Sequence, residues 1–436
     1  MGLEYHIDFQ NRRDVSITDA NGKELKLPDI FFQIPKEKWL TQESLPKQPL
    51  QIFDLSKTSL DCNLVSPKTP IIYGQSTNSD FLQLNSLNID IFGSAFFMLT
   101  RYEEMVKWQR DEHGRFPARA SLAYQEGFLE RPIINEYIEI LWACFKRLWP
   151  RLERKKKIFH MLLTHDVDLP FEYLFLSPAR LLRRLLGDIL ISKKPFLAIN
   201  RSITWSKVKM GNIYDDPLYT FDRIMDMTER NGLRSAFYFI SAGEKHRYNQ
   251  GYNIRHPKIR QLLRNINDRG HEIGLHASYF SYQSSEKIKN ELNTLKEVLK
   301  EEKIQQEVRG GRQHYLRWEV PTTWQNWEEA GLEYDTTIGF ADHVGFRCGL
   351  SHEYQAFNLR TRETLKLKER PLIVMESSLI DYMGIDYENI LQKIMLLKNR
   401  CSMFGGNFVL LWHNNYFVEN SIFNEIYDNI LQNNTS

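Results

Sequence analysis

Acidic and imidazole side chains follow several short apolar segments of this sequence. Asp166 and Asp168 come directly after one such segment, two residues apart, so an extended chain points both carboxylates to the same side. His276 ends a second apolar segment, and His413 follows a third. Taken singly, such residues more often cap turns or pack in a core. Together, carboxylates and imidazoles bind divalent cations and exchange protons, so the set indicates metal-assisted hydrolysis.

Apolar and amphipathic segments alternate along the part of the chain that carries these residues. Strand-like runs occupy residues 158–164, 235–240, 272–276, 371–375 and 407–412. Helices are predicted over 221–232 and 286–300, the second with Ser284 or Ser285 as its N-cap. Such alternation predicts an α/β fold with a parallel sheet, here a closed or partly closed barrel, whose functional side chains lie at the carboxyl ends of the strands.

Five short motifs in this part resemble those of the polysaccharide deacetylase family, which is related to the chitooligosaccharide deacetylase of nodulation. They are THDVD (164–168), GHEIGLHASY (270–279), RQHY (312–315), GLEYDTTIGFAD (331–342) and LLWH (410–413). The resemblance implies a distorted (β/α) barrel and a metal-dependent hydrolase of non-peptide C–N bonds. Such an enzyme removes an N-acetyl or related acyl group from an amino sugar in a glycan or glycan precursor, and the implied cofactor is zinc or another divalent cation.

The resemblance also implies a role for each matching residue. Asp166 would be the base that takes a proton from water, while Asp168 and His276 would hold the metal. His413 would donate a proton to the leaving amine. A separate base and acid are needed because the water loses a proton and the amine gains one.

The third motif implies two further contributions to the reaction. Arg312 would orient Asp166 and keep it ionised, and a backbone N–H near Tyr315 would hold the oxyanion. His314 stands in this motif where proline is usual.

Two positions depart from the family pattern. Val167 separates two acids that are usually adjacent, and Phe280 stands where a second metal-binding histidine is usual. Three interpretations remain open: a third ligand from elsewhere, a weakly bound metal, or a degenerate domain that binds carbohydrate without cleaving it. A hydrolase of small non-sugar amides is a further alternative. The candidate third ligands, which the sequence does not rank, are His246, His256, His343 and His352.

Residues 1–150 predict a smaller mixed α/β domain of unknown function, followed by the barrel domain over 158–436. The charged run 151–157 marks the boundary. Strands are predicted at 29–34 and 70–74 and helices at 91–108 and 133–150. The segment FFMLTRYEE (96–104) resembles an uncharacterised domain that precedes some bacterial deacetylase-like domains. Its Arg101, Glu103 and Glu104 are expected to form surface ion pairs.

Composition limits the partners of the chain. The net charge of +2, from 57 basic and 55 acidic residues, gives no long-range attraction to nucleic acid. Four widely spaced cysteines do not indicate a disulfide framework. Trp318, Trp324 and Trp327 suit either sugar stacking or core packing.

No signal peptide or membrane-spanning segment is expected from the sequence, which predicts a cytoplasmic protein. Its substrate would then be a nucleotide-linked or lipid-linked intermediate of bacterial surface polysaccharide assembly. The segment 174–191 is predicted to be an amphipathic helix packed on the protein surface, with contact to a membrane surface as the less favoured alternative.

Overall fold

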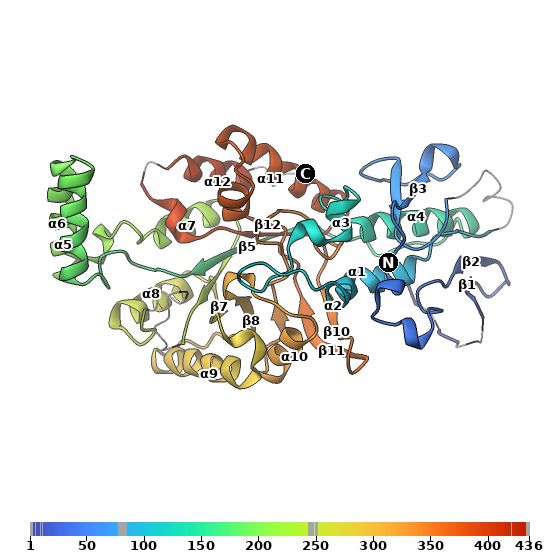
Figure 1. Cartoon of the computed structure of the whole chain (residues 1–436), viewed down its shortest axis with the longest axis horizontal. Helices are drawn as coiled ribbons and strands as arrows, with labels where there is room; N and C mark the ends of the chain where they lie inside the picture. The colour runs from blue at the N-terminus through green and yellow to red at the C-terminus, as the bar shows by residue number, and fades with distance from the viewer. Residues whose placement is uncertain are drawn as a thin grey trace.

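The computed structural model describes residues 3–4, 6–8, 10, 12–76, 85–242, 248, 252–419 and 421–432. Within these residues, the largest unit is a nine-stranded sheet with helices around it (Figure 1). The strand order is β10-β11-β9-β8-β7-β6-β5-β13-β12. Neighbouring strands are parallel except for the antiparallel pair β10 and β11. This curled, mostly parallel sheet confirms the predicted fold class, an open and distorted (β/α) barrel.

The strands of the sheet are β5 (His160–Val167), β6 (Ser235–Phe239), β7 (Glu272–Ala277), β8 (Gly310–Gln313), β9 (Tyr334–Asp335), β10 (Tyr354–Asn358), β11 (Glu363–Glu369), β12 (Val374–Met375) and β13 (Asn407–Leu411). The helices around it are α7 (Phe221–Arg230), α8 (Pro257–Asp268), α9 (Ser285–Glu301), α10 (Thr322–Glu329), α11 (Tyr387–Met403) and α12 (Ile422–Gln432). The predicted helix over 286–300 is confirmed as α9, and the Ser284 side chain accepts a hydrogen bond from the backbone N–H of Lys287 as its N-cap.

Strand β8 was not predicted, because its Gly310-Gly311 pair is typical of loops. The structure gives the physical reason for the pair: a Cβ at position 311 would lie 1.8 Å from the carbonyl oxygen of Leu275 on β7. Glycine therefore allows the two strands to approach closely. The next residue, Arg312, pairs in register with His276 of β7.

The N-terminal part contains two small antiparallel strand pairs and four α-helices in its described residues. Its strands are β1 (Asp14–Thr18), β2 (Glu24–Pro28), β3 (Gln51–Asp54) and β4 (Lys68–Ile71), and its helices are α1 (Ile91–Leu99), α2 (Tyr102–Val106), α3 (Leu122–Gln125) and α4 (Ile133–Leu148). The predicted strand at 29–34 is wrong, because this segment turns to bury Phe31 among aromatic rings. The predicted helix over 91–108 is broken at Arg101, whose φ is 55°.

The expectation of surface ion pairs at Arg101, Glu103 and Glu104 is also wrong. All three side chains are almost fully buried. Glu104 pairs with Arg101 at 2.8 Å and with Arg347, from the loop before β10, at 2.6 Å. Burial opposes ionisation of Glu104, but the two guanidinium groups outweigh it and hold its pKa below the ordinary value. This network attaches the N-terminal part to the sheet, while the domain boundary at 151–157 stays a prediction.

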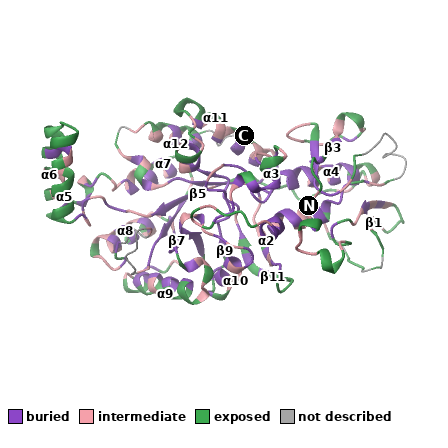
Figure 2. Cartoon of the chain, viewed as in Figure 1, coloured by how far each residue is buried: buried purple, intermediate pink, exposed green. Residues whose placement is uncertain are grey.

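The segment 174–191 does not form the expected packed surface helix. Helices α5 (Pro178–Leu186) and α6 (Pro195–Lys209) form a hairpin that extends from one end of the molecule (Figure 1). Most of its residues are exposed (Figure 2). Among the described residues, no helix is both long and apolar enough to span a bilayer.

The close contact at Gly311 generates a stability prediction. We expect Gly311→Ala to lower the free energy of unfolding by about 1–3 kcal/mol or more, because the new methyl group meets the backbone of β7. Gly187→Ala is the matched control, since Gly187 has helical dihedral angles and its new methyl group would have no atom from outside its own helix within 4 Å. Denaturant titration measures both variants. If Gly311→Ala and Gly187→Ala had the same free energy of unfolding, the proposed contact would be contradicted.

Candidate functional site

The carboxyl ends of β5, β7, β8 and β13 surround one cavity of about 600 Å³. The residues of the predicted site that line it are Asp166, Asp168, His276, Tyr315 and His413. His314, from the turn after β8, also lines it. Arg312 lies directly behind the cavity wall and reaches Asp166. The strand-end rule therefore brings the predicted residues together from segments up to about 250 positions apart.

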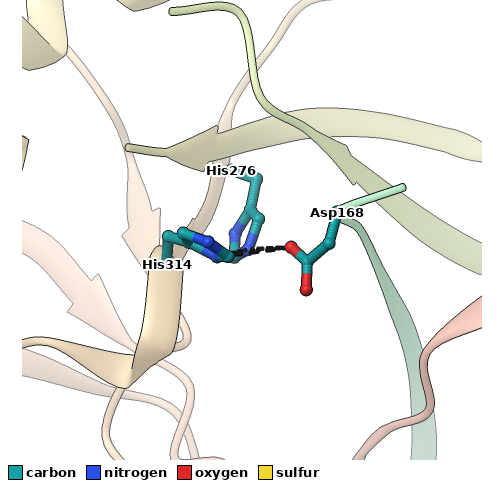
Figure 3. Close-up of side chains that lie close together, drawn as sticks. All are labelled: Asp168, His276 and His314. Atoms are coloured by element: carbon teal, nitrogen blue, oxygen red, sulfur yellow. Dashed lines mark hydrogen bonds and ion pairs between the residues drawn. The ribbon is translucent and has the colours of Figure 1, made fainter. Parts of the chain in front are cut away.

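Three potential metal ligands converge in this cavity. Oδ1 of Asp168 lies 3.1 Å from Nε2 of His276 and 3.3 Å from Nδ1 of His314 (Figure 3). The two ring nitrogens are 2.9 Å apart. Both imidazoles are nearly inaccessible to solvent. These three atoms form a compact triangle, and the group is one that could hold a metal ion.

Backbone carbonyls determine which ring nitrogens carry protons. Nδ1 of His276 lies 2.9 Å from the carbonyl oxygen of Arg312, and Nε2 of His314 lies 2.6 Å from that of Tyr248. A carbonyl oxygen only accepts hydrogen bonds, so each of these nitrogens must donate. In the neutral rings, the opposite nitrogens are then unprotonated and face each other and Asp168. Three acceptors at such distances repel one another unless a proton or a metal cation lies between them.

The size of the triangle suits a small divalent cation. Zinc bonds of about 2.0–2.1 Å at tetrahedral angles separate two ligand atoms by about 3.3 Å. The three observed separations are 2.9, 3.1 and 3.3 Å. Oδ1 of Asp168 is buried and has no well-formed hydrogen bond among the described residues. Two imidazoles and a carboxylate are also a donor set of catalytic zinc sites, which leave one position open.

Asp166 lies beside the triangle, held by a buried arginine. Its Oδ1 accepts a 2.8 Å hydrogen bond from Nη1 of Arg312, and its Oδ2 lies 3.7 Å from Nε2 of His276. Arg312 is itself fixed by the carbonyl of Thr336 at 2.9 Å. Burial opposes ionisation of Asp166, but neighbouring positive charge, chiefly that of Arg312, outweighs it and holds its pKa below the ordinary value.

His413 lies on the other side, 3.7 Å from Oδ2 of Asp168. Its Nδ1 makes a short contact with Oε1 of Glu376, which is completely buried after β12. Burial favours the neutral ring, but the Glu376 carboxylate, together with Asp168 and Asp166, raises the pKa of His413 to about 10. The ring is therefore protonated at neutral pH and can donate a proton into the cavity.

The turn after β8 has an unusual backbone. Tyr315 and Leu316 have φ values of 61° and 53°, in the left-handed region that few residues other than glycine adopt. The carbonyl oxygen of Tyr315 accepts a 3.0 Å hydrogen bond from Arg115 of the N-terminal part. Backbone strain of this kind is often found at functional sites. Here it directs both His314 and Tyr315 to the cavity.

Comparison with known proteins gives two family matches. Residues 211–334 match the polysaccharide deacetylase family.

This match confirms the resemblance to that family for the segment that carries the second and third motifs.

Residues 1–150 match a family of unknown function, DUF7033. The segment 211–334 includes the second and third motifs, whereas THDVD and LLWH lie outside it. No curated protein matches the chain.

Solved structures show weaker likeness to the deacetylase domain. One, from Mycobacterium smegmatis and provisionally named a polysaccharide deacetylase, has a TM-score of 0.41 and 15% identity over 65% of this chain and 87% of its own. Another with that provisional name, from Pseudomonas aeruginosa, has a TM-score of 0.36 and 12% identity over 63% and 83%. An allantoinase has a TM-score of 0.37 and 11% identity over 64% and 85%. These values carry no information about the site.

Three of the four histidines that the sequence offers as candidate third ligands lie away from the cavity. His256 caps helix α8 by accepting a hydrogen bond from the backbone N–H of Lys258. His343 pairs with Asp342 at 3.5 Å, and His352 lies 3.0 Å from the side chain of Asn135. His246 lies outside the described residues. Phe280 is 41% exposed and does not belong to the described cavity lining.

Three residues that line or support the cavity were missed in the sequence. The sequence analysis noted His314 only as a departure from proline. Arg312 pairs with His276, and His314 lies two positions after Arg312. Strand geometry alone therefore brings His314 to the same edge as His276. Glu376 gave a weaker signal, an acid directly after a predicted strand. Arg115 gave no signal in the sequence, because it comes from the N-terminal part, which has no recognisable catalytic pattern.

The aromatic residues near the third motif are structural. Trp318, Trp324 and Trp327 are at most 2% exposed and pack in the core, so they do not stack on a sugar. His165 is also buried, stacked on Phe237 with a ring-centroid distance of 4.9 Å. It therefore packs on the face of β5 opposite Asp166.

Behind the cavity, two buried carboxyl groups face each other across β9 and β11. Asp335 pairs in register with Glu369. Glu369 accepts hydrogen bonds from Trp324 Nε1 at 2.9 Å and from the backbone N–H of Ile338 at 3.1 Å. Burial raises the pKa of both carboxyl groups, to about 7 for Asp335, and the charge of Asp335 raises that of Glu369 further.

This pair generates a pH-dependent prediction. A carboxyl group whose pKa rises on folding stabilises the fold while it is protonated, and this contribution is lost as the pH rises from about 4 to 7. We therefore expect Asp335→Asn to gain stability relative to the parent over that range, by up to about 1.4 kcal/mol per pH unit. Denaturation from pH 4 to 8 measures it, with the exposed Asp268→Asn as control. A pH-independent difference would contradict the prediction.

The ligand triangle generates a metal-binding prediction. We expect metal-stripped protein to bind Zn²⁺ with a Kd of about 1 μM or tighter, measured by titration calorimetry. His314→Ala and His276→Ala should each weaken binding by more than about 100-fold, because loss of residues that merely orient ligands already costs 10–100-fold. His256→Ala and Phe280→Ala are controls expected to bind as the parent does. Parent-like binding by His314→Ala would exclude His314 as a ligand.

Proposed function

We propose that this protein is a metal-dependent hydrolase that removes an N-acetyl or related acyl group from an amino sugar in a glycan or glycan precursor. The observation that carries the proposal is the convergence of Asp168, His276 and His314 in one cavity, between Asp166 and His413. Membership of the deacetylase family supports the same chemistry.

Asp168, His276 and His314 are the proposed metal ligands, and zinc is the proposed ion. A divalent cation bound there supplies Lewis acidity, which polarises an acyl carbonyl and lowers the pKa of water. The donor set, two imidazoles and one carboxylate, favours zinc over the harder cations magnesium and calcium, which prefer oxygen ligands.

The proton transfers are assigned to residues on either side of the ligands. Asp166, kept ionised by Arg312, takes a proton from the attacking water. The C–N bond then breaks, and His413, charged beside Glu376, donates a proton to the departing amine. The backbone N–H of Tyr315 is proposed to stabilise the oxyanion. Base and acid contribute typically 10²–10⁴-fold each to such reactions.

The cavity lining supports a polar, ring-shaped substrate. Tyr315, Tyr382 and Tyr416 line it and offer aromatic faces and hydroxyl groups, which suit a sugar. Arg115 from the N-terminal part reaches the hydroxyl of Tyr382 at 3.1 Å. The proposed contribution of the N-terminal part is therefore to complete the substrate cavity. A cytoplasmic location, and a nucleotide-linked or lipid-linked glycan as substrate, remain parts of the proposal.

Activity measurements test the assignment of base and acid. We expect Asp166→Asn and His413→Gln each to lower kcat by about 10²–10⁴-fold in zinc-loaded protein, because each removes one proton transfer. His343→Gln is the matched control, since this histidine lies outside the cavity lining. The readout is acetate release from N-acetylglucosamine oligomers.

The same assay separates the alternatives. Ammonia release from small amides without acetate release would indicate an amidase. Zinc-loaded protein that binds the oligomers, yet releases neither product, would indicate a carbohydrate-binding domain that has lost catalysis.

A further inference from the structure

The α5–α6 hairpin is a separately packed unit. Residues 178–210 form α5, a π-helical turn at Gly187–Ile191, and α6. A small core apart from the main one holds the hairpin to the preceding loop; it consists of Tyr173, Leu176, Leu181 and Val208. An ion pair at 2.9 Å joins Arg201 of α6 to Asp188 of the turn. The hairpin thus has a fixed shape while most of its surface faces solvent (Figure 2).

Apolar side chains are concentrated on this exposed surface. The large exposed hydrophobic residues of the hairpin are Leu182, Leu186, Ile189, Leu190, Ile191, Phe196, Leu197, Ile199, Ile203 and Met210. The most exposed near the turn are Leu190, Ile191 and Phe196, at 70%, 84% and 81%. Several recur at helical spacing, which produces an apolar face on each helix. Scattered exposed hydrophobics are ordinary, but a cluster of this density marks an interaction surface.

The hairpin is also strongly basic. Its cationic residues are Arg180, Arg183, Arg184, Lys193, Lys194, Arg201, Lys207 and Lys209. Asp188 is its single acidic residue. Because the whole chain has a net charge of only +2, this local charge is offset by an acidic remainder. Lys193 and Lys194 directly follow the apolar residues of the turn.

We propose that the α5–α6 hairpin is a docking surface for an anionic lipid bilayer. Apolar side chains at a helical turn, flanked by lysines, are suited to insert among acyl chains while the lysines contact lipid phosphates. Each basic residue near an anionic membrane adds about 1 kcal/mol of attraction. A second copy of this chain is the other apolar occupant to consider, but it would bring an equally basic hairpin and like charges would oppose the contact. Charge therefore selects the bilayer.

The hairpin adjoins the cavity of the proposed function. Arg184 of α5 lines that cavity and pairs with Glu172, another lining residue, at 2.5 Å. Docking of the hairpin would thus bring the cavity close to lipid headgroups. If the proposed hydrolase function holds, on which this step rests, the substrate class is a glycan attached to a lipid.

Vesicle sedimentation tests the docking surface independently of any enzymatic activity. We expect the full chain to bind vesicles containing about 30% phosphatidylglycerol and to be released by 0.5 M salt, because salt screens exposed charges. Leu190→Ser/Ile191→Ser/Phe196→Ser should weaken partitioning by about 100-fold or more. Lys193→Glu/Lys194→Glu should weaken it by about tenfold or more.

Matched controls use exposed residues outside the hairpin. Trp108→Ser/Ile158→Ser removes two apolar side chains that are 87% and 69% exposed, and Lys155→Glu/Lys156→Glu reverses two exposed charges. Both should bind as the parent does, and thermal unfolding should show all variants folded. Failure of the parent to bind, or equal binding to neutral phosphatidylcholine vesicles, would overturn the proposal. So would a dimer in sedimentation velocity that the triple variant dissociates while vesicle binding is absent.

Discussion

The close approach of His276, His314 and the carboxylate of Asp168 is the constraint on which the site depends. Each imidazole directs one ring nitrogen to a backbone carbonyl, so its other nitrogen points into the cavity. The protein therefore maintains an arrangement that is unfavourable by itself and becomes favourable with a cation. Burying acceptors without such compensation lowers the stability of a fold by several kcal/mol.

The surrounding structure serves to hold these acceptors in place. The glycine pair of β8 lets its backbone approach β7 closely enough for the carbonyl of Arg312 to reach His276. The same residue extends its guanidinium to Asp166, so one position fixes both a proposed ligand and the proposed base. On the opposite side, Glu376 balances the charge of His413. Positive and negative groups therefore alternate across the cavity. The order is Arg312, Asp166, the proposed ligand group, His413 and Glu376.

The sequence predicted the parts of the fold that have a repeated local signal. Alternating apolar runs gave β5, β6, β7 and β13, and spacing of three and four residues gave α9. Strand β8 was not predicted, because its close packing against β7 requires glycines, which have low strand propensity. The third candidate ligand was missed for a related reason: His314 becomes a neighbour of His276 only through the register of two strands, and register has no local signature. Motifs therefore located the site, whereas its completion depended on tertiary geometry.

The N-terminal part and the α5–α6 hairpin each contribute a residue to the lining of the cavity. Arg115 contacts the backbone of Tyr315, so the N-terminal part holds the strained turn that also carries His314. Arg184 connects the same cavity to the basic hairpin on the other side. Two segments outside the motif-bearing strands thus bring one cationic side chain each to the cavity. Since the proposed ligands and the base and acid all come from the strand ends, the role we propose for these additions is to orient a substrate without taking part in bond cleavage.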